Sequence, residues 1–296
     1  MNTSQITRKA YKKIISGAAL VRRNACCVSG DKTCHNQVNL EWVDNNNLGD
    51  ELAPVIYNWM LEKRQIQPNQ YARKTIHLMT VGSMVGTWNF DATIWGSGIH
   101  TFSNVSKLSR LRHIQKFDIR AVRGPVTRSA LMSCGHICPE IYGDPAVLMP
   151  FIYVPDNLEK KYPLSVVLHY RAGDEWKTLG SFEGCELRYL NIGTNNYKQY
   201  IDEMVLSEKI ISSSLHGIIL AETYGIPAIF LDTGGYVNEA LMKYYDWYYS
   251  TGRYSVKVAR SLEEAIKMEP MQLPELDRMR ENLLEAFPYD LWKNIQ

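Results

Sequence analysis

Short apolar runs alternate with amphipathic segments along most of this chain. The first runs, residues 75–81, 92–95 and 117–122, have the length and composition of buried strands. Gly124-Pro125 then begins a helix that ends at Gly135, because proline favours the first helical position and glycine the position after the last. Repeated strand, loop and helix units predict a parallel sheet and the α/β class.

A second set of such units follows residues 155–162, a polar stretch without a clear period that we interpret as a linker. Further strands are predicted at 164–168, 187–192, 209–211 and 227–231, and further helices at 197–206, 215–224 and 273–286. We therefore expect two Rossmann-like domains facing a central cleft, residues 36–155 and 163–296, with the last helices in the second. Ligands of such folds bind at the carboxyl ends of the strands.

The first 35 residues carry seven lysines and arginines and one acid, Asp31. Contact with an anionic membrane surface would explain this excess, and a solvated basic helix followed by a loop fits it equally well. The apolar run at 14–21 is short and is followed by Arg22-Arg23, so we expect no cleaved signal peptide. No stretch is long enough to span a bilayer. We predict a cytoplasmic protein, peripheral on the inner face of the membrane.

Two classes of partner are not expected. The net charge of +2 creates no general attraction for nucleic acid. Cys26-Cys27 and Cys34-His35 form a loose group, but no CxxC pair and no second ligand pair at zinc-finger spacing accompany them. We therefore expect no metal, and free thiols in a reducing compartment.

The segment from Ser212 to Gly217 combines an apolar strand end, three serines and the start of a helix. The N–H groups and dipole of a helix start favour an anion. We predict anion binding by Ser213, Ser214, Leu215, His216 and Gly217, with a catalytic role for His216. A serine-capped helix with a buried histidine is an equally good interpretation.

Other polar residues lie at the ends of predicted strands or the starts of helices. Asp50 precedes a helical pattern at 51–60 and is either an N-cap or a general acid or base. Arg123 precedes Gly124-Pro125, and its guanidinium would suit a carboxylate or phosphate, unless it is a surface arginine. His169 and Arg171 follow a strand and would face the crevice.

Ser97 and His100 follow the strand at 92–95, where small residues allow a ligand close to the backbone. The Gly96-Ser97-Gly98 run does not match the dinucleotide-binding fingerprint.

The order of these motifs resembles that of the polysaccharide pyruvyltransferases, in particular the ketal pyruvyltransferases of bacterial exopolysaccharide pathways. The resemblance covers roughly residues 38–255. The matching segments are Asn47-Leu48-Gly49-Asp50-Glu51-Leu52, Val81-Gly82-Ser83, Trp95-Gly96-Ser97-Gly98, Val122-Arg123-Gly124-Pro125, Tyr142-Gly143-Asp144-Pro145-Ala146, His169-Tyr170, Ser212 through Gly217, Ala221-Glu222, Tyr224-Gly225-Ile226-Pro227, Asp246-Trp247-Tyr248 and Gly252-Arg253. Each motif alone is common, and their shared order is specific.

The resemblance implies a fold similar to the two-domain glycosyltransferase B architecture. It implies phosphoenolpyruvate as co-substrate, no cofactor, and a sugar product that carries a pyruvate ketal. The acceptor would be a sugar of a polysaccharide, and the basic start of the chain fits an acceptor carried on a membrane lipid.

Roles for individual residues follow from the same resemblance. Asp50 is the first candidate for proton transfer, and a cationic His216 would stabilise the departing phosphate. Some members have an arginine immediately before Leu-His, where this chain has Ser214, so another arginine would supply that charge. The arginines considered for the donor are Arg123, Arg171 and Arg253. The acceptor or second-rank candidates are His100, His169, Ser97, Glu222 and Arg253.

Two other functions fit the same patterns. A glycosyltransferase that uses a nucleotide-activated sugar has the same two-domain fold, which therefore does not separate the two activities. A nucleotide sugar that raises the melting temperature, with phosphoenolpyruvate inert, would favour that function. A non-catalytic glycan-binding subunit would bind the acceptor and turn over no donor.

Overall fold

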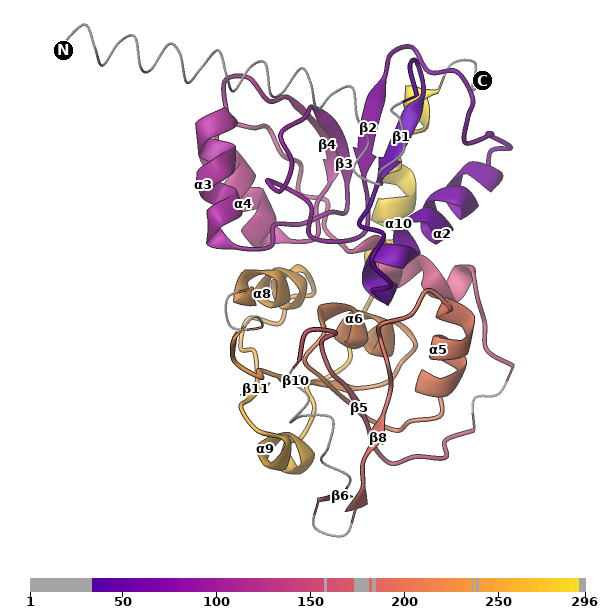
Figure 1. Cartoon of the computed structure of the whole chain (residues 1–296), viewed down its shortest axis with the longest axis vertical. Coiled ribbons are helices and arrows are strands. Elements are labelled where there is room, and N and C mark those ends of the chain that lie inside the picture. Colours follow the sequence, from indigo (N-terminus) through magenta and orange to yellow (C-terminus); the bar gives the residue numbers. More distant parts are fainter. Residues whose placement is uncertain are drawn as a thin grey trace, which may run out of the picture.

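The structure is a computed structural model that describes residues 34–156, 159–172, 181–182, 185–235, 237 and 240–292. Nearly all of the basic segment predicted at 1–35 lies outside these residues. The chain forms two parallel sheets, one from each half of the sequence, with helices around them (Figure 1). The α/β class predicted from the sequence is thereby confirmed. Among the described helices, none has both the length and the apolar character needed to cross a membrane.

The first sheet has the strand order β1-β2-β3-β4, with all neighbours parallel. Its strands are β1 (Val38–Glu41), β2 (Ile76–Met79), β3 (Ala92–Trp95) and β4 (Phe117–Ala121). The helices that follow these strands are α2 (Leu48–Glu62), α3 (Phe102–Leu111) and α4 (Pro125–Ser133). Successive strand residues alternate between faces: Ile94 packs with α3 and α4, and Trp95 packs with α2.

The second sheet has the strand order β11-β10-β9-β5-β8, again parallel. Its strands are β5 (Ser165–Val167), β8 (Arg188–Tyr189), β9 (Ile210–Ser212), β10 (Ala228–Leu231) and β11 (Val258–Ala259). The helices around it are α5 (Tyr197–Met204), α6 (Leu215–Thr223), α8 (Leu241–Ser250) and α9 (Leu262–Lys267). A separate antiparallel pair is formed by β6 (Ser181–Phe182) and β7 (Cys185–Glu186).

Helix α6 is buried along its whole length, which is expected of a helix that is apolar on every side. It contacts the second sheet, α2, α8 and the 3₁₀ helix η1 (Pro145–Phe151), and so joins the two halves. Gly217 allows this close packing, because a Cβ there would lie 2.3 Å from Ser212 Oγ and 2.8 Å from Val167 Cγ1.

The end of the chain returns to the first sheet. Helix α10 (Asp277–Ala286) contacts β4 and η1, and Trp95 Nε1 donates a 2.9 Å hydrogen bond to the carbonyl of Leu283. After the short 3₁₀ helix η3 (Tyr289–Leu291), Trp292 pairs with Ala72 in an antiparallel bridge. The last helix in the sequence thus completes the packing of the first sheet.

Candidate active site

A cavity of about 250 Å³ lies where the carboxyl ends of strands from the two sheets meet. Residues that follow β1, β2 and β3 line one side, and residues that follow β5 and β9 line the other. The predicted site residues that line it are Asp50, His100, His169, Arg171, Ser214, Leu215 and His216. Their convergence agrees with the rule that ligands of parallel sheets bind at this edge.

Asp50 lies in the first turn of α2, whose N-cap position is Asn47. The N-cap alternative for Asp50 is therefore wrong, because Asp50 is the third residue inside the helix. Asn47 Nδ2 donates a 2.9 Å hydrogen bond to Asp50 Oδ2. Burial raises the pKa of the Asp50 carboxyl, and His216, Asn47 and Lys243 partly oppose this shift. Asp50 thus holds a proton to higher pH than an exposed aspartate does.

His216 lies in the first turn of α6 and is held between the two halves of the molecule. Its Nε2 is 3.5 Å from Oδ2 of Asp144, a fully buried residue just before η1. The Oδ1 atom of Asp144 accepts a hydrogen bond from the Ala146 N–H, which fixes the carboxylate. On the other side, a Cβ on Gly49 would lie 1.8 Å from His216 Nδ1. The ring position therefore depends on Asp144 and on the absence of a side chain at Gly49.

The three serines before α6 hold the loop and do not cap the helix. Ser214 occupies the N-cap position, but its side chain makes no capping bond. Ser212 Oγ accepts from the Ser214 N–H at 3.0 Å, and Ser213 Oγ accepts from the His169 N–H at 2.8 Å. The alternative that a serine caps this helix is thus wrong. No side chain of the described residues caps the first N–H groups of α6.

Lys243 of α8 also lines the cavity and is not among the residues predicted from the sequence. Its residue is only 7% exposed, and burial, together with Arg123 and Arg171, lowers the pKa of its ammonium to about 7. The signal in the sequence is a lysine inside a run whose neighbours Tyr244, Trp247 and Tyr248 are all buried aromatics. Only Asp246-Trp247-Tyr248 of this run belongs to the motifs that resemble the family.

Two histidines face the same cavity and are neutral at neutral pH. Burial, reinforced by Lys243, lowers the pKa of His100 to about 4 and that of His169 to about 3. A neutral imidazole can both donate and accept a hydrogen bond, which suits the hydroxyl groups of a sugar.

Arg123 is fully buried behind the cavity. Its Nε lies 3.2 Å from Asp246 Oδ2, its Nη1 donates to Ser83 Oγ at 2.6 Å, and its Nη2 donates to the Ile99 carbonyl at 2.6 Å. Ser83 itself lines the cavity. In this structure the Arg123 guanidinium thus contacts protein acceptors and positions Ser83. The alternative interpretation, that Arg123 is a surface arginine, is wrong.

The remaining predicted residues lie outside the cavity lining, and they are Ser97, Ser213, Gly217, Glu222 and Arg253. Ser97 Oγ donates to the Gly82 carbonyl at 2.9 Å. Glu222 accepts from Arg253 Nη2 at 2.7 Å and from Trp247 Nε1 at 2.8 Å. These contacts support the loops and helices around the cavity.

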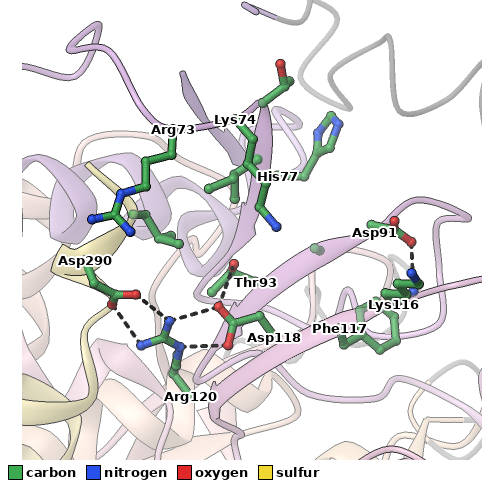
Figure 2. Close-up of a pocket in the computed structure, with 14 residues that line it drawn as sticks. Arg73, Lys74, His77, Asp91, Thr93, Lys116, Phe117, Asp118, Arg120 and Asp290 are labelled. Atoms are coloured by element: carbon green, nitrogen blue, oxygen red, sulfur yellow. Dashed lines mark hydrogen bonds and ion pairs between the residues drawn. The ribbon is translucent and has the colours of Figure 1, made fainter. Parts of the chain in front are cut away.

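A larger cavity of about 480 Å³ lies at the opposite edge of the first sheet, where β2, β3 and β4 begin. Figure 2 shows that Arg120 in this cavity is bonded to Asp118 on one side and to Asp290 on the other. Because these carboxylates neutralise it and because the amino ends of strands are not the usual ligand edge, the smaller cavity is the better candidate site.

Gly49→Ala should lower the rate of the reaction catalysed at this site by about 10²-fold. The added Cβ would displace the His216 ring, and a displacement of reacting groups by about 1 Å lowers reaction rates by this factor. Alanine is the better helix former by about 1 kcal/mol, so helix propensity would not account for the loss. The matched control is Asn58→Ala, at an exposed position of the same helix. Steady-state kinetics beside a melting curve measures both effects, and wild-type turnover in Gly49→Ala would contradict the assigned geometry.

Part of the chain is similar to a known protein family. The family model "Polysaccharide pyruvyl transferase" matches residues 86–235. The chain is 30% identical over 176 residues to the uncharacterized protein L143 of Acanthamoeba polyphaga mimivirus, over 58% of each chain. It is 25% identical over 210 residues to the succinoglycan biosynthesis protein ExoV of Rhizobium meliloti (strain 1021), over 70% of this chain and 62% of that protein. The matches thus span about three fifths of the length of these relatives.

A solved structure of a functionally uncharacterized protein from Klebsiella pneumoniae aligns with 88% of this chain and the whole of that chain, at a TM-score of 0.47 and 14% identity. The family match covers half of this chain and includes His100, Arg123, Asp144, His169 and His216. By this match the chain belongs to the polysaccharide pyruvyl transferase family.

Proposed function

We propose that this protein transfers the pyruvyl group of phosphoenolpyruvate to two hydroxyls of a sugar, forming a pyruvate ketal and releasing phosphate. The sugar belongs to a polysaccharide or to its lipid-linked precursor. The observation that carries the proposal is the cavity of this chain, which belongs to the pyruvyl transferase family. The cavity brings together Lys243, Arg171, Asp50 and His216.

The donor is anionic at both its phosphate and its carboxylate. Lys243 and Arg171 provide positive charge in the cavity, and the uncapped start of α6 provides N–H groups beside Ser214 and His216. His216 as a cation would stabilise the charge that develops on the departing phosphate. Asp144 Oδ2, 3.5 Å from His216 Nε2, would pair with the imidazole in its charged form.

Asp50 is suited to the proton transfers of ketal formation. Its raised pKa lets the carboxyl deliver a proton to the methylene carbon of the donor, which leaves an oxocarbenium-like centre at the adjacent carbon. One sugar hydroxyl then attacks that carbon and returns its proton to the Asp50 carboxylate. The bond to the phosphate oxygen breaks, the second hydroxyl closes the ring, and its proton leaves with phosphate. Protons thus balance without another reactant.

The acceptor sugar would bind in the same cavity. His100 and His169 are neutral there and can bind sugar hydroxyls, and Trp88 also lines the cavity with an aromatic ring of the kind on which sugars stack.

We also propose the finer architecture that the sequence predicts, two Rossmann-like domains in a glycosyltransferase B-like arrangement. Two parallel sheets whose carboxyl ends meet at the cavity support it. The basic residues before residue 35 support a cytoplasmic location at the inner membrane face.

The test is an incubation of the purified protein with phosphoenolpyruvate and a panel of galactosides, mannosides and glucosides. We expect phosphate release only with a suitable acceptor, and a product heavier than the acceptor by one pyruvate less one water. Phosphoenolpyruvate should raise the melting temperature. Stabilisation by a nucleotide sugar alone would favour a glycosyltransferase, and acceptor binding without turnover of any donor would favour a glycan-binding subunit.

A further inference from the structure

We infer that Lys243 binds an anionic group of the donor. The identity of the donor in this inference rests on the proposed function. The placement of Lys243 does not, since it follows from the cavity and from the helix that carries the lysine.

Helix α8 is fixed so that Lys243 faces the cavity. One turn further along the helix, Asp246 accepts hydrogen bonds from the Thr127 N–H at 2.9 Å and from Thr127 Oγ1 at 2.6 Å, and it pairs with Arg123. Gly124 lets the α4 turn approach this helix, because a Cβ there would lie 2.0 Å from the Asp246 carbonyl oxygen. The lysine is thus presented from a helix that is anchored to the first half of the molecule.

The other cations near the cavity are placed differently. Arg123 is turned away to Asp246, Ser83 and Ile99, and Arg253 is bonded to Glu222. Lys243 and Arg171 both line the cavity. Lys243 is buried, whereas Arg171 is exposed on a loop. A buried ammonium attracts an anion more strongly than an exposed one, because less water screens it.

Titratable and charged groups around Lys243 determine how it responds to an anion. They are Asp50 from α2, Arg123 after β4, Arg171 and His169 after β5, His100 after β3, and His216 from α6. Burial and the neighbouring arginines lower the pKa of Lys243 to about 7, so its charge is present below pH 7 and is lost above it. A bound anion favours the protonated amine. Donor affinity should therefore fall as pH rises from 7 to 9, and donor binding in this range should take up a proton.

The test compares Lys243→Met with Lys243→Arg in the full-length protein. Loss of one charge-assisted contact should raise the Kd and KM for phosphoenolpyruvate roughly 10- to 100-fold in Lys243→Met. Lys243→Arg should stay closer to the wild type and should lose the fall in affinity between pH 7 and 9, because arginine remains charged. Comparison of the two proteins at each pH cancels the titration of the donor itself. Lys267→Met, on the exposed side of α9, is the control.

A second-site variant separates charge from folding. Ser214 lines the same cavity, so Ser214→Arg in the Lys243→Met background places a guanidinium there and should recover part of the lost affinity. Wild-type donor affinity in Lys243→Met would overturn the inference, and so would a loss that neither Lys243→Arg nor Ser214→Arg relieves.

Inorganic phosphate is the probe that keeps this inference distinct from the proposed function. If the wild type does not turn over phosphoenolpyruvate with any acceptor, the proposed function fails. Weaker phosphate binding in Lys243→Met than in the wild type, measured by calorimetry, would still support Lys243 as the anion ligand. Equal phosphate affinity in the two proteins would overturn it.

Discussion

Replacement of His216 by alanine should lower kcat/KM for phosphoenolpyruvate by about 10²- to 10⁴-fold, the range expected when a proton-transfer or charge-stabilising group is removed. The ring is nearly buried, faces the cavity and contacts Asp144 at 3.5 Å. We expect the loss mainly in kcat, because stabilisation of the departing phosphate acts in the transition state and not on bound donor.

His113→Ala is the control for the loss of an imidazole, since His113 is exposed and accepts a hydrogen bond from its neighbour Arg112. Steady-state kinetics with a phosphate-release readout compares the two variants, and melting curves confirm that both are folded. Unchanged kcat in folded His216→Ala would remove this residue from the mechanism.

Replacement of Asp246 by alanine should lower the free energy of unfolding by about 3–5 kcal/mol, because it leaves the Arg123 guanidinium buried without its counter-charge. It also removes the acceptor of two hydrogen bonds from Thr127. Denaturant-induced unfolding measures the change, with Glu263→Ala as the control. Glu263 forms an exposed pair with Lys267 one helical turn away, which is worth about 0.3–0.5 kcal/mol.

The double variant Arg123→Met with Asp246→Leu tests the cause of that loss. Two apolar side chains leave no buried charge, so the double variant should be more stable than Asp246→Ala. The losses in the free energy of unfolding are also measured for Arg123→Met and Asp246→Leu alone. If the loss in the double variant equals the sum of these two losses, an unpaired buried charge is not the cause of the instability.

Elements with a local pattern were predictable from the sequence. The strands at 92–95 and 227–231 and the helix at 215–224 appear in the structure as β3, β10 and α6 with shifts of one residue or none. Strand β1 was missed, because two of its four residues are polar. Asn39 bonds to the Ile76 carbonyl and Glu41 to His77, and these partners are distant in the sequence.

Among the site residues, too, those with a local sequence pattern were predictable, and contacts between residues distant in the sequence were not. Asp50, His169 and His216 were found because each lies at the start of a helix or at the end of a strand, where parallel sheets bind ligands. Lys243 also lies in the first turn of a helix, but the sequence pattern predicts no helix at 241–250, and the lysine was therefore missed. The acceptors of Arg123 were also unpredictable, since Asp246 is 123 residues further along the chain.

The return of the chain end to the first sheet has a consequence for biosynthesis. The carbonyl of Leu283 and the ring of Phe287 cover Trp95, and Trp292 pairs with Ala72. A ribosome that has translated as far as residue 255 has made every residue of the cavity, but the face of the first sheet around Trp95 still lacks its cover. We expect the half that emerges first to complete its packing last, after residues 283–292 have been made.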